Sequence, residues 1–267
     1  MNVIQAIIVG LIQGLTEFLP ISSSGHLILT QYFLGFGEGS DLSFEIFLHL
    51  GTLIAVMLYF KNDIIRLLMS LVHFKNPDFQ SDRKISLWLI IATAVTGGLG
   101  IVFKDTISKE FTNPILVSTM IGLTGIIVYY SDKIKEGELD SSKLTIHKSI
   151  LIGFCQAIAI IPGISRSGTT ITISLLTGLK RSQAATFSFL LSIPVILGAN
   201  ISEIKTFTNL NTSQLLIYLI GFTFAFISGF IVIKWLMNLI VKARLRYFAY
   251  YCWGISIISI GLILYGF

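Results

Sequence analysis

Apolar stretches of about 20 residues, separated by short charged connections, run through most of this sequence. Apolar residues make up 54% of the 267 positions and charged residues only 12%, about half the share in an ordinary soluble domain. The mean hydropathy is +0.82. One water-soluble core cannot bury that much apolar surface, so soluble enzymes, disordered tails and collagen-like chains are excluded. The sequence predicts an all-α polytopic membrane protein, formed as a single membrane domain over residues 1–267.

Six of the apolar stretches are uninterrupted and long enough to cross a bilayer. They lie near 41–60, 85–103, 113–130, 182–199, 214–233 and 247–266. Residues 1–10 lack the basic start of a cleavable signal peptide, so we expect them to belong to the mature chain.

Two further apolar stretches, 3–35 and 149–179, are interrupted by the segments PISSSG (20–25) and PGISRSG (162–168). Proline removes a helical hydrogen bond, and glycine and serine favour turns, so a helix cannot pass cleanly through either segment. Irregular backbone at membrane depth must be buried in protein or line a wet cavity. We therefore expect two re-entrant helix–loop–helix hairpins in addition to the six spans.

The distribution of lysine and arginine tests this topology. If both hairpins return to the side that they left, fifteen of these residues fall in connections on one side and three on the other. The positive-inside rule then places the basic connections in the cytoplasm and both termini outside. The net charge of +5 follows from this arrangement, and we expect no nucleic-acid partner.

The two interrupted stretches are related by an internal repeat with an offset of 143 residues. The offset places Gly10, Gln13, Ser22, Ser24 and Gly25 on Gly153, Gln156, Ser165, Ser167 and Gly168. Three predicted spans separate the copies, so the second (about 149–267) is inverted relative to the first (about 1–130). The hairpin tips then meet near a pseudo-two-fold axis. Such inverted repeats of broken helices are typical of secondary transporters.

Few ionisable residues lie at membrane depth: Glu17, His26 and Arg166, with Glu45 and His49 as further candidates. A charge at the bilayer centre costs about 2.5–3.5 kcal/mol, so it usually faces the protein interior and has a partner. Glu17 and Arg166 flank the two interruptions. They form either a structural ion pair that locks the hairpins together or part of a functional site.

The surroundings of Arg166 favour a phosphate site. Hydroxyls and backbone N–H groups at a helix N-terminus attract anions, and a guanidinium binds phosphate oxygens in a bidentate manner. Two opposed helix N-termini suit a ligand with two phosphates. The candidate binding residues in the two interruptions are Ser22, Ser23, Ser24, Ser165, Ser167, Gly168 and Thr170.

Gln13 and Glu17 lie one helical turn apart, so their side-chain oxygens share a face. Carboxylate and phosphate oxygens together attract Mg²⁺ or Ca²⁺, and Glu17 would be the main protein ligand. A buried amide that joins helices is the alternative for Gln13.

His26 follows three serines, which suggests a nucleophile with its base. The alternatives for His26 are that it carries the phosphoryl group itself, that it protonates the leaving oxygen, or that it only joins helices. We expect His49 to be a packing histidine, and Glu45 either to support the site or to lie at the membrane edge.

The segment from Gln13 to His26 resembles the first signature of the undecaprenyl-diphosphate phosphatases, the bacitracin-resistance family of bacterial membranes. PGISRSGTT (162–170) is similar to their second signature. The resemblance implies a hydrolase that removes the terminal phosphate of undecaprenyl diphosphate. It returns undecaprenyl phosphate to cell-wall peptidoglycan synthesis, which supports cell shape and raises resistance to bacitracin. The implied location is the bacterial cytoplasmic (inner) membrane, with the active site facing outside.

The resemblance also implies roles for individual residues. Ser23 matches the nucleophile, His26 an invariant histidine and Arg166 the phosphate-binding arginine. Glu17 matches an acidic metal-binding or catalytic residue, and Gln13 a position where the family has Glu or Gln. Positions with matching hydroxyls are Ser24, Ser165 and Thr170.

The alternative function is a polyprenyl-phosphate transporter or flippase, because inverted repeats with broken helices usually signal transport. A flippase needs an anion site but no nucleophile. In either case the expected partners are a polyprenyl diphosphate or monophosphate lipid and the surrounding membrane lipids. Chains of this size often pair in membranes, so a homodimer is compatible with the sequence.

Overall fold

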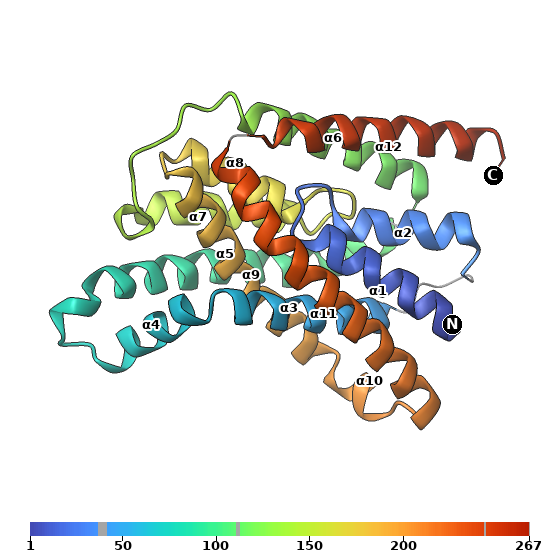
Figure 1. Ribbon diagram of the computed structural model, residues 1–267, viewed down its shortest axis with the longest axis horizontal. Coiled ribbons are helices and arrows are strands. Elements are labelled where there is room, and N and C mark those ends of the chain that lie inside the picture. The colour runs from blue at the N-terminus through green and yellow to red at the C-terminus, as the bar shows by residue number, and fades with distance from the viewer. Residues whose placement is uncertain (37–41, 111–112, 243, 267) are drawn as a thin grey trace.

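The computed structural model describes residues 1–36, 42–110, 113–242 and 244–266, and the regular elements there are helices (Figure 1). Across these residues there is no β-strand, and Leu139 and Leu179 form an isolated β-bridge. The α-helices in chain order are α1 (Val3–Glu17), α2 (Ser23–Leu34), α3 (Leu42–Tyr59), α4 (Lys61–Val72), α5 (Gln80–Glu110), α6 (Pro114–Ser131), α7 (Ile146–Ile158), α8 (Arg166–Leu176), α9 (Arg181–Ser202), α10 (Ile204–Thr208), α11 (Thr212–Val241) and α12 (Arg246–Leu264). Short 3₁₀ helices η1 (Pro77–Phe79) and η2 (Ser141–Lys143) lie in two of the connections.

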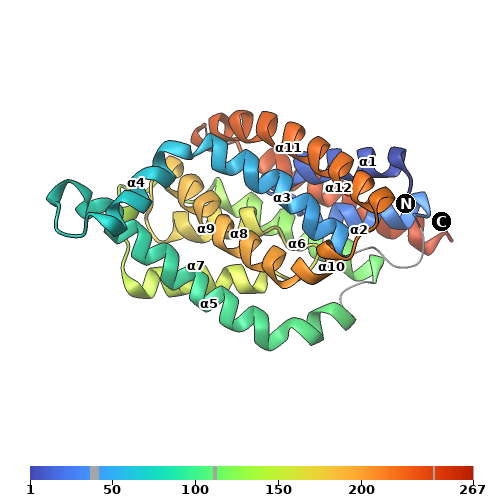
Figure 2. The ribbon, with the colours of Figure 1, turned by 90° about the horizontal axis from the view of Figure 1, so that it is seen from below.

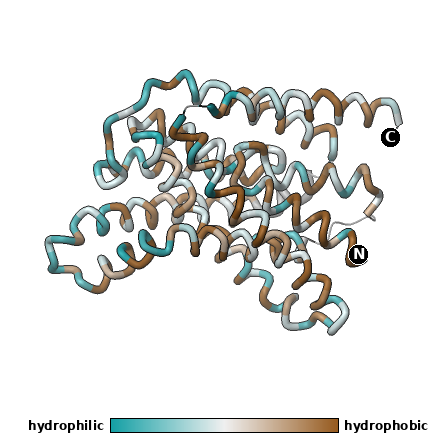
Figure 3. Tube along the Cα trace, viewed as in Figure 1, coloured by the Kyte–Doolittle hydropathy of each residue, from teal (hydrophilic) through white to brown (hydrophobic). Residues whose placement is uncertain are grey.

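The prediction of a polytopic membrane protein is confirmed. Five of the described helices are long and apolar enough to cross a bilayer, and the bent pair α3–α4 gives up to six. Hydrophobic residues extend along the helices, whereas hydrophilic ones gather in the connections (Figure 3). Each of the six ranges predicted as spans overlaps a helix, although residue 41 lies outside the described residues.

Parts of several expected connections are helical instead, including most of 200–208 (the end of α9, then α10) and 234–241 (the end of α11). Residues 61–72, counted as part of a loop, form α4, which leaves α3 at an angle of 81°. Its apolar residues recur at helical spacing, and Lys61, Asp63 and Arg66 lie between them. This is the pattern of an amphipathic helix, whereas counting the charges alone predicts a loop. Residues 104–110, also expected in a loop, continue α5 to Glu110.

Close helix packing depends on glycine at matched positions of the repeat. α1 packs on α11, and α7 packs on α5. A methyl group added to Gly10 would lie 2.4 Å from the Gly221 carbonyl oxygen, and one added to Gly153 would lie 2.5 Å from that of Ala92. Because only a residue without a side chain permits such contact, glycine sets the position of α1 and α7.

The two ends of the molecule are formed by different segments of the chain. Both termini lie at one end of the long axis, and α4 with the connection to α5 lies at the other (Figures 1 and 2). Most of the interruption at 18–22 and the end of the interruption at 159–165 are buried, whereas Ile160 is exposed.

Candidate active site

Each interrupted stretch folds as two helices joined by a short irregular segment. α1 ends at Glu17 and α2 begins at Ser23; α7 ends at Ile158 and α8 begins at Arg166. Pro20 in the first segment, and Pro162 with Gly163 in the second, prevent the preceding helix from continuing. Ser22 then accepts a hydrogen bond from the Gly25 N–H (3.2 Å), as Ser165 does from the Gly168 N–H (3.1 Å). Each second helix therefore starts with a serine cap.

Ser22 has φ of +72°, the left-handed region that L-residues other than glycine rarely adopt. No other non-glycine residue in the described part of the chain has positive φ. Backbone strain of this kind is concentrated at functional sites, where the surrounding structure holds it in place.

The two interruptions contact each other with a reciprocal pattern. A methyl group on Gly25 would lie 3.1 Å from the Gly163 Cα, and one on Gly168 would lie 3.2 Å from the Pro20 Cβ. The 143-residue offset exchanges these two contacts. The Ser167 hydroxyl also donates to the Leu19 carbonyl oxygen (3.1 Å), so residues far apart in the chain form one surface.

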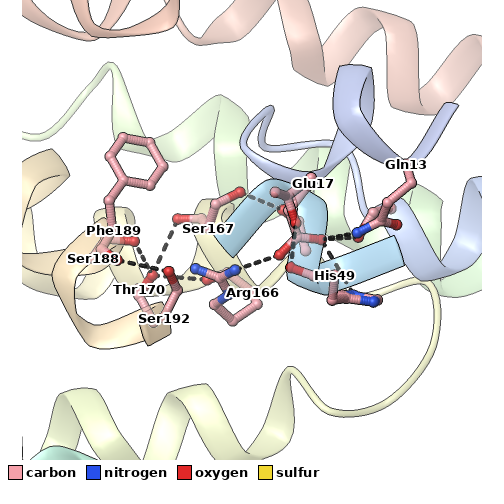
Figure 4. Close-up of polar contacts among 12 residues, drawn as sticks. Gln13, Glu17, His49, Arg166, Ser167, Thr170, Ser188, Phe189 and Ser192 are labelled. Atoms are coloured by element: carbon pink, nitrogen blue, oxygen red, sulfur yellow. Dashed lines mark hydrogen bonds and ion pairs between the residues drawn. The ribbon is translucent and has the colours of Figure 1, made fainter. Parts of the chain in front are cut away.

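Glu17 is at the centre of the polar contacts between the interruptions (Figure 4). Arg166 Nη2 donates to its Oε1 at 2.5 Å. The Ser23 hydroxyl donates to Oε2 at 2.7 Å and Gln13 Nε2 at 3.1 Å. His49 Nε2 lies 3.4 Å from the same oxygen. An ion pair between the two membrane-depth charges, one of the two alternatives that the sequence left open, is present, and three further side chains contact the carboxylate.

A cavity of about 250 Å³ opens beside this cluster. Its polar wall comes from both copies of the repeat: Glu17, Ser22, Ser23, Ser24, His49, Thr96, Gln156, Ser165 and Arg166. Its apolar wall includes Ile46, Ile160, Ile164, Val195 and Ile196. The second guanidinium nitrogen of Arg166, Nη1, is buried and has no hydrogen-bond partner among the described residues. A charged donor at a cavity wall is suited to an anion.

His26 is held outside this cavity. Its Nδ1 lies 2.7 Å from the Ser22 carbonyl oxygen and its Nε2 lies 3.0 Å from the Tyr251 hydroxyl. The two rings stack with centroids 5.5 Å apart. Since Nδ1 must donate to the carbonyl, Nε2 of the neutral ring accepts from Tyr251. In this structure the Ser23 hydroxyl therefore donates its hydrogen bond to Glu17, and not to His26 as the sequence suggested.

Gly168 and Thr170, two further predicted binding residues, do not line the cavity but contact residues that do. The Thr170 hydroxyl contacts the Ser188 hydroxyl (2.5 Å) and the Arg166 carbonyl oxygen (2.8 Å) within the protein (Figure 4). Gly168 lies against Pro20, as described above, and its N–H is used by the Ser165 cap.

A divalent cation is compatible with the donors near Glu17. Gln13 Oε1 is buried and has no hydrogen-bond partner among the described residues. Together with the Glu17 carboxylate it gives one face of the helix two side chains whose oxygen atoms can bind a metal ion. Nowhere in the described part of the chain do three His, Cys, Asp or Glu side chains gather as a metal site. A cation at this place would take its other ligands from phosphate and water, as Mg²⁺ often does.

Comparison with known proteins shows which family this chain belongs to. The model of the family described as bacitracin resistance protein BacA matches residues 6–258. The chain belongs to this family. The chain is 45% identical to the undecaprenyl-diphosphatase of Methanobrevibacter smithii, with 97% of this chain and 96% of that protein aligned. It is 40% identical to the undecaprenyl-diphosphatase of Halothermothrix orenii, with 97% and 98% aligned.

Within this BacA-family site, sequence reasoning missed several residues. His49, expected to be a packing residue, contacts Glu17 and lines the cavity; its position in an apolar span was the available signal. The Thr124 hydroxyl donates to the Gly163 carbonyl oxygen (2.8 Å) and accepts from the Ser165 N–H (2.9 Å). Nothing in the sequence marked Thr124 or Tyr251, because their roles depend on tertiary packing.

Proposed function

We propose that this chain is an undecaprenyl-diphosphatase, a membrane phosphatase that removes the terminal phosphate of undecaprenyl diphosphate. The product, undecaprenyl phosphate, returns to cell-wall synthesis, and more of the enzyme raises resistance to bacitracin. Its membership of the BacA family and the two relatives named above support this function. The observation that carries the mechanism is the chain of contacts Ser23–Glu17–Arg166 at the junction of two helix N-termini.

Binding begins with the charge of the diphosphate. Arg166 Nη1 and the serine hydroxyls of both interruptions donate to phosphate oxygens, and the N-termini of α2 and α8 add favourable dipoles. The first isoprene units of the lipid lie against Ile46, Ile160 and Val195 on the apolar wall. Binding of substrate loosens the contact between Arg166 and Glu17, because phosphate competes for the guanidinium.

The chemical step uses the Ser23–Glu17 hydrogen bond. Ser23 Oγ attacks the terminal phosphorus and its proton passes to the Glu17 carboxylate. The bond from phosphorus to the bridging oxygen breaks, and the Glu17 proton moves to the departing polyprenyl phosphate. Arg166 stabilises the charge that develops on the transferring group. Water then releases phosphate and restores Ser23.

His26 acts through the backbone in this proposal. Its bonds to the Ser22 carbonyl and Tyr251 hold the strained turn that presents Ser23. Glu17 would hold a divalent cation together with the diphosphate, and the cation would neutralise part of the phosphate charge.

The protein arrangement that goes with this function is six spans and two re-entrant hairpins in an inverted repeat. The reciprocal contacts of Gly25 with Gly163 and of Gly168 with Pro20 support a pseudo-two-fold axis between the hairpins. Since both termini lie at the end opposite α4, and lysine and arginine are concentrated in the connections at the α4 end, we place the termini and the active site outside the cytoplasmic membrane. Cysteines introduced at Asp78 and at Asn209 should react with an impermeant thiol reagent only from the inside and the outside, respectively.

The test of the function is the release of inorganic phosphate from a long-chain polyprenyl diphosphate by detergent-purified protein. Wild type and Arg166→Ala are compared with and without EDTA, and gel filtration reports folding. Release that requires Arg166 supports the phosphatase, and its loss in EDTA supports the cation. Release that is unaffected by EDTA removes the cation from the mechanism. No release by folded wild type that still binds the lipid would reject the phosphatase in favour of a flippase, which needs no Ser23–Glu17 pair.

A further inference from the structure

Gln156 on α7 is a buried residue that lines the cavity, and only the nitrogen of its side-chain amide has a hydrogen-bond partner among the described residues. Its side chain is fully buried, and its Nε2 donates to the Thr96 hydroxyl oxygen at 3.0 Å. Its Oε1 has no hydrogen-bond partner among the described residues. Buried amide oxygens are almost always paired, so an unpaired one at a cavity points to a ligand.

Thr96 fixes the orientation of this amide. A threonine hydroxyl has a single hydrogen, and that of Thr96 is directed to the carbonyl oxygens of Ala92 and Gly153, each 2.9 Å away. The Thr96 oxygen can therefore only accept from Gln156. A flipped amide would set two acceptors against each other, so Nε2 faces Thr96, and Oε1 is the atom left without a partner in a residue that lines the cavity.

An amide oxygen is an acceptor, which restricts what it can bind. Phosphate oxygens are acceptors too and would be repelled, whereas Arg166 and the serine hydroxyls in the same wall are the donors that suit phosphate. The proposed reaction has one further reactant, water, and water donates hydrogen bonds. We infer that Gln156 Oε1 binds and orients the water that attacks phosphorus; this inference rests on the proposed phosphatase function.

The step that this water performs completes the reaction cycle. The water oxygen forms a bond to the phosphorus held on Ser23, and the bond from phosphorus to Ser23 Oγ breaks. One water proton passes through the Glu17 carboxylate to Ser23 Oγ. Inorganic phosphate leaves and the Ser23 hydroxyl is restored. Gln156 holds the water by its other hydrogen, and Thr96 is the positioning residue for Gln156.

Gln13 shows why the repeat does not simply duplicate this role. It occupies the matching position of the first copy, and its Oε1 is likewise unpaired. Its Nε2, however, donates to Glu17, and Gln13 is not among the residues that line the cavity. Only the second copy of the repeat places this amide at the cavity wall.

The experiment compares wild type with Gln156→Leu, which keeps the bulk of the side chain but removes the acceptor. With substrate labelled in its terminal phosphate, we expect kcat to fall roughly 10- to 100-fold and KM to fall with it, so that kcat/KM, which reports the attack by Ser23, stays within about twofold. Labelled phosphoryl-enzyme should accumulate in the variant, because Ser23 still attacks while water does not. A loss caused only by disturbed packing would not produce this build-up.

A second set of variants keeps the test valid if Gln156→Leu fails to fold. Thr96→Val should reproduce part of the kcat loss and the labelled intermediate, and Thr96→Ser should restore both toward wild type. Thr93→Val, on the same helix with its hydroxyl bonded to Leu89, is the matched control. Unchanged kcat in folded Gln156→Leu overturns the inference, as does a loss without phosphoryl-enzyme that is recovered by added Mg²⁺. In both cases phosphate release by wild type leaves the proposed function standing.

Discussion

The Ser23 hydroxyl donates a 2.7 Å hydrogen bond to Glu17 Oε2, across the break between α1 and α2. The other oxygen of the same carboxylate accepts from Arg166 Nη2 on the opposite hairpin. A carboxylate that contacts both a hydroxyl and a guanidinium joins the atom proposed to attack with the group proposed to bind phosphate. This geometry supports the proposed proton acceptance by Glu17, while His26 is hydrogen-bonded to the Ser22 carbonyl oxygen of the turn.

Ser23 and Glu17 are expected to act as one unit. Ser23→Ala and Glu17→Gln should each lower kcat by about 10²–10⁴-fold, since either change removes the same proton transfer. The double variant should be no slower than the slower single variant, because effects within a catalytic unit are not additive. Phosphate release in detergent measures all three. Losses that multiply in the double variant would show that the two residues act separately.

Arg166→Ala should affect stability and activity differently. It leaves the buried Glu17 carboxylate without its guanidinium, which costs about 3–5 kcal/mol, and it removes a donor to phosphate. Adding Glu17→Gln to Arg166→Ala should recover most of the thermal stability in detergent but none of the turnover. A double variant that regains turnover would contradict a role in phosphate binding and leave only a structural ion pair.

His49→Leu should slow the reaction although no sequence motif includes this residue. Its Nε2 is 3.4 Å from Glu17 Oε2 and its Nδ1 is 2.7 Å from the Glu45 carbonyl oxygen, so the ring is fixed against the carboxylate. Loss of a contact to a charged group is worth about 1.5–3 kcal/mol, or roughly 10- to 100-fold in kcat. His73→Leu, at an exposed position beyond α4, is the control and should keep wild-type turnover. Equal turnover in both variants would return His49 to a packing role.

The sequence predicted the spans because apolar length alone decides them, and the breaks because proline and glycine mark them. It also offered a Glu17–Arg166 ion pair as one of two alternatives, since charges at membrane depth need partners. α4 escaped prediction because Lys61 and Asp63 resemble a connection when charge is counted without periodicity.

The contacts of Ser23 and His26 could not be predicted, because they depend on the path of the turn between them and α1. With Ser22 at φ +72°, the hydroxyl of Ser23 turns back to Glu17 and the ring of His26 turns to Tyr251, a residue 225 positions away. Motif spacing records that such residues are present. It does not record which of them the chain brings together.

The glycines of the repeat provide a stability test that is independent of catalysis. Gly10→Ala and Gly153→Ala would each place a methyl group within 2.5 Å of a backbone carbonyl oxygen on the neighbouring helix. Backbone cannot move aside as a flexible side chain can, so each change should lower the free energy of unfolding by about 1–3 kcal/mol.

Gly97→Ala and Gly98→Ala on α5 are the matched controls, because an added methyl group there meets nothing within 4 Å. Alanine is the better helix former, so these changes should be neutral or raise stability by up to about 1 kcal/mol. Thermal unfolding in detergent measures all four variants. Since the contacts of Gly10 with α11 and of Gly153 with α5 hold equivalent helices of the two copies, similar losses at both positions are expected from an inverted repeat. A large loss at one position and none at the other would mean that the two copies do not share this packing.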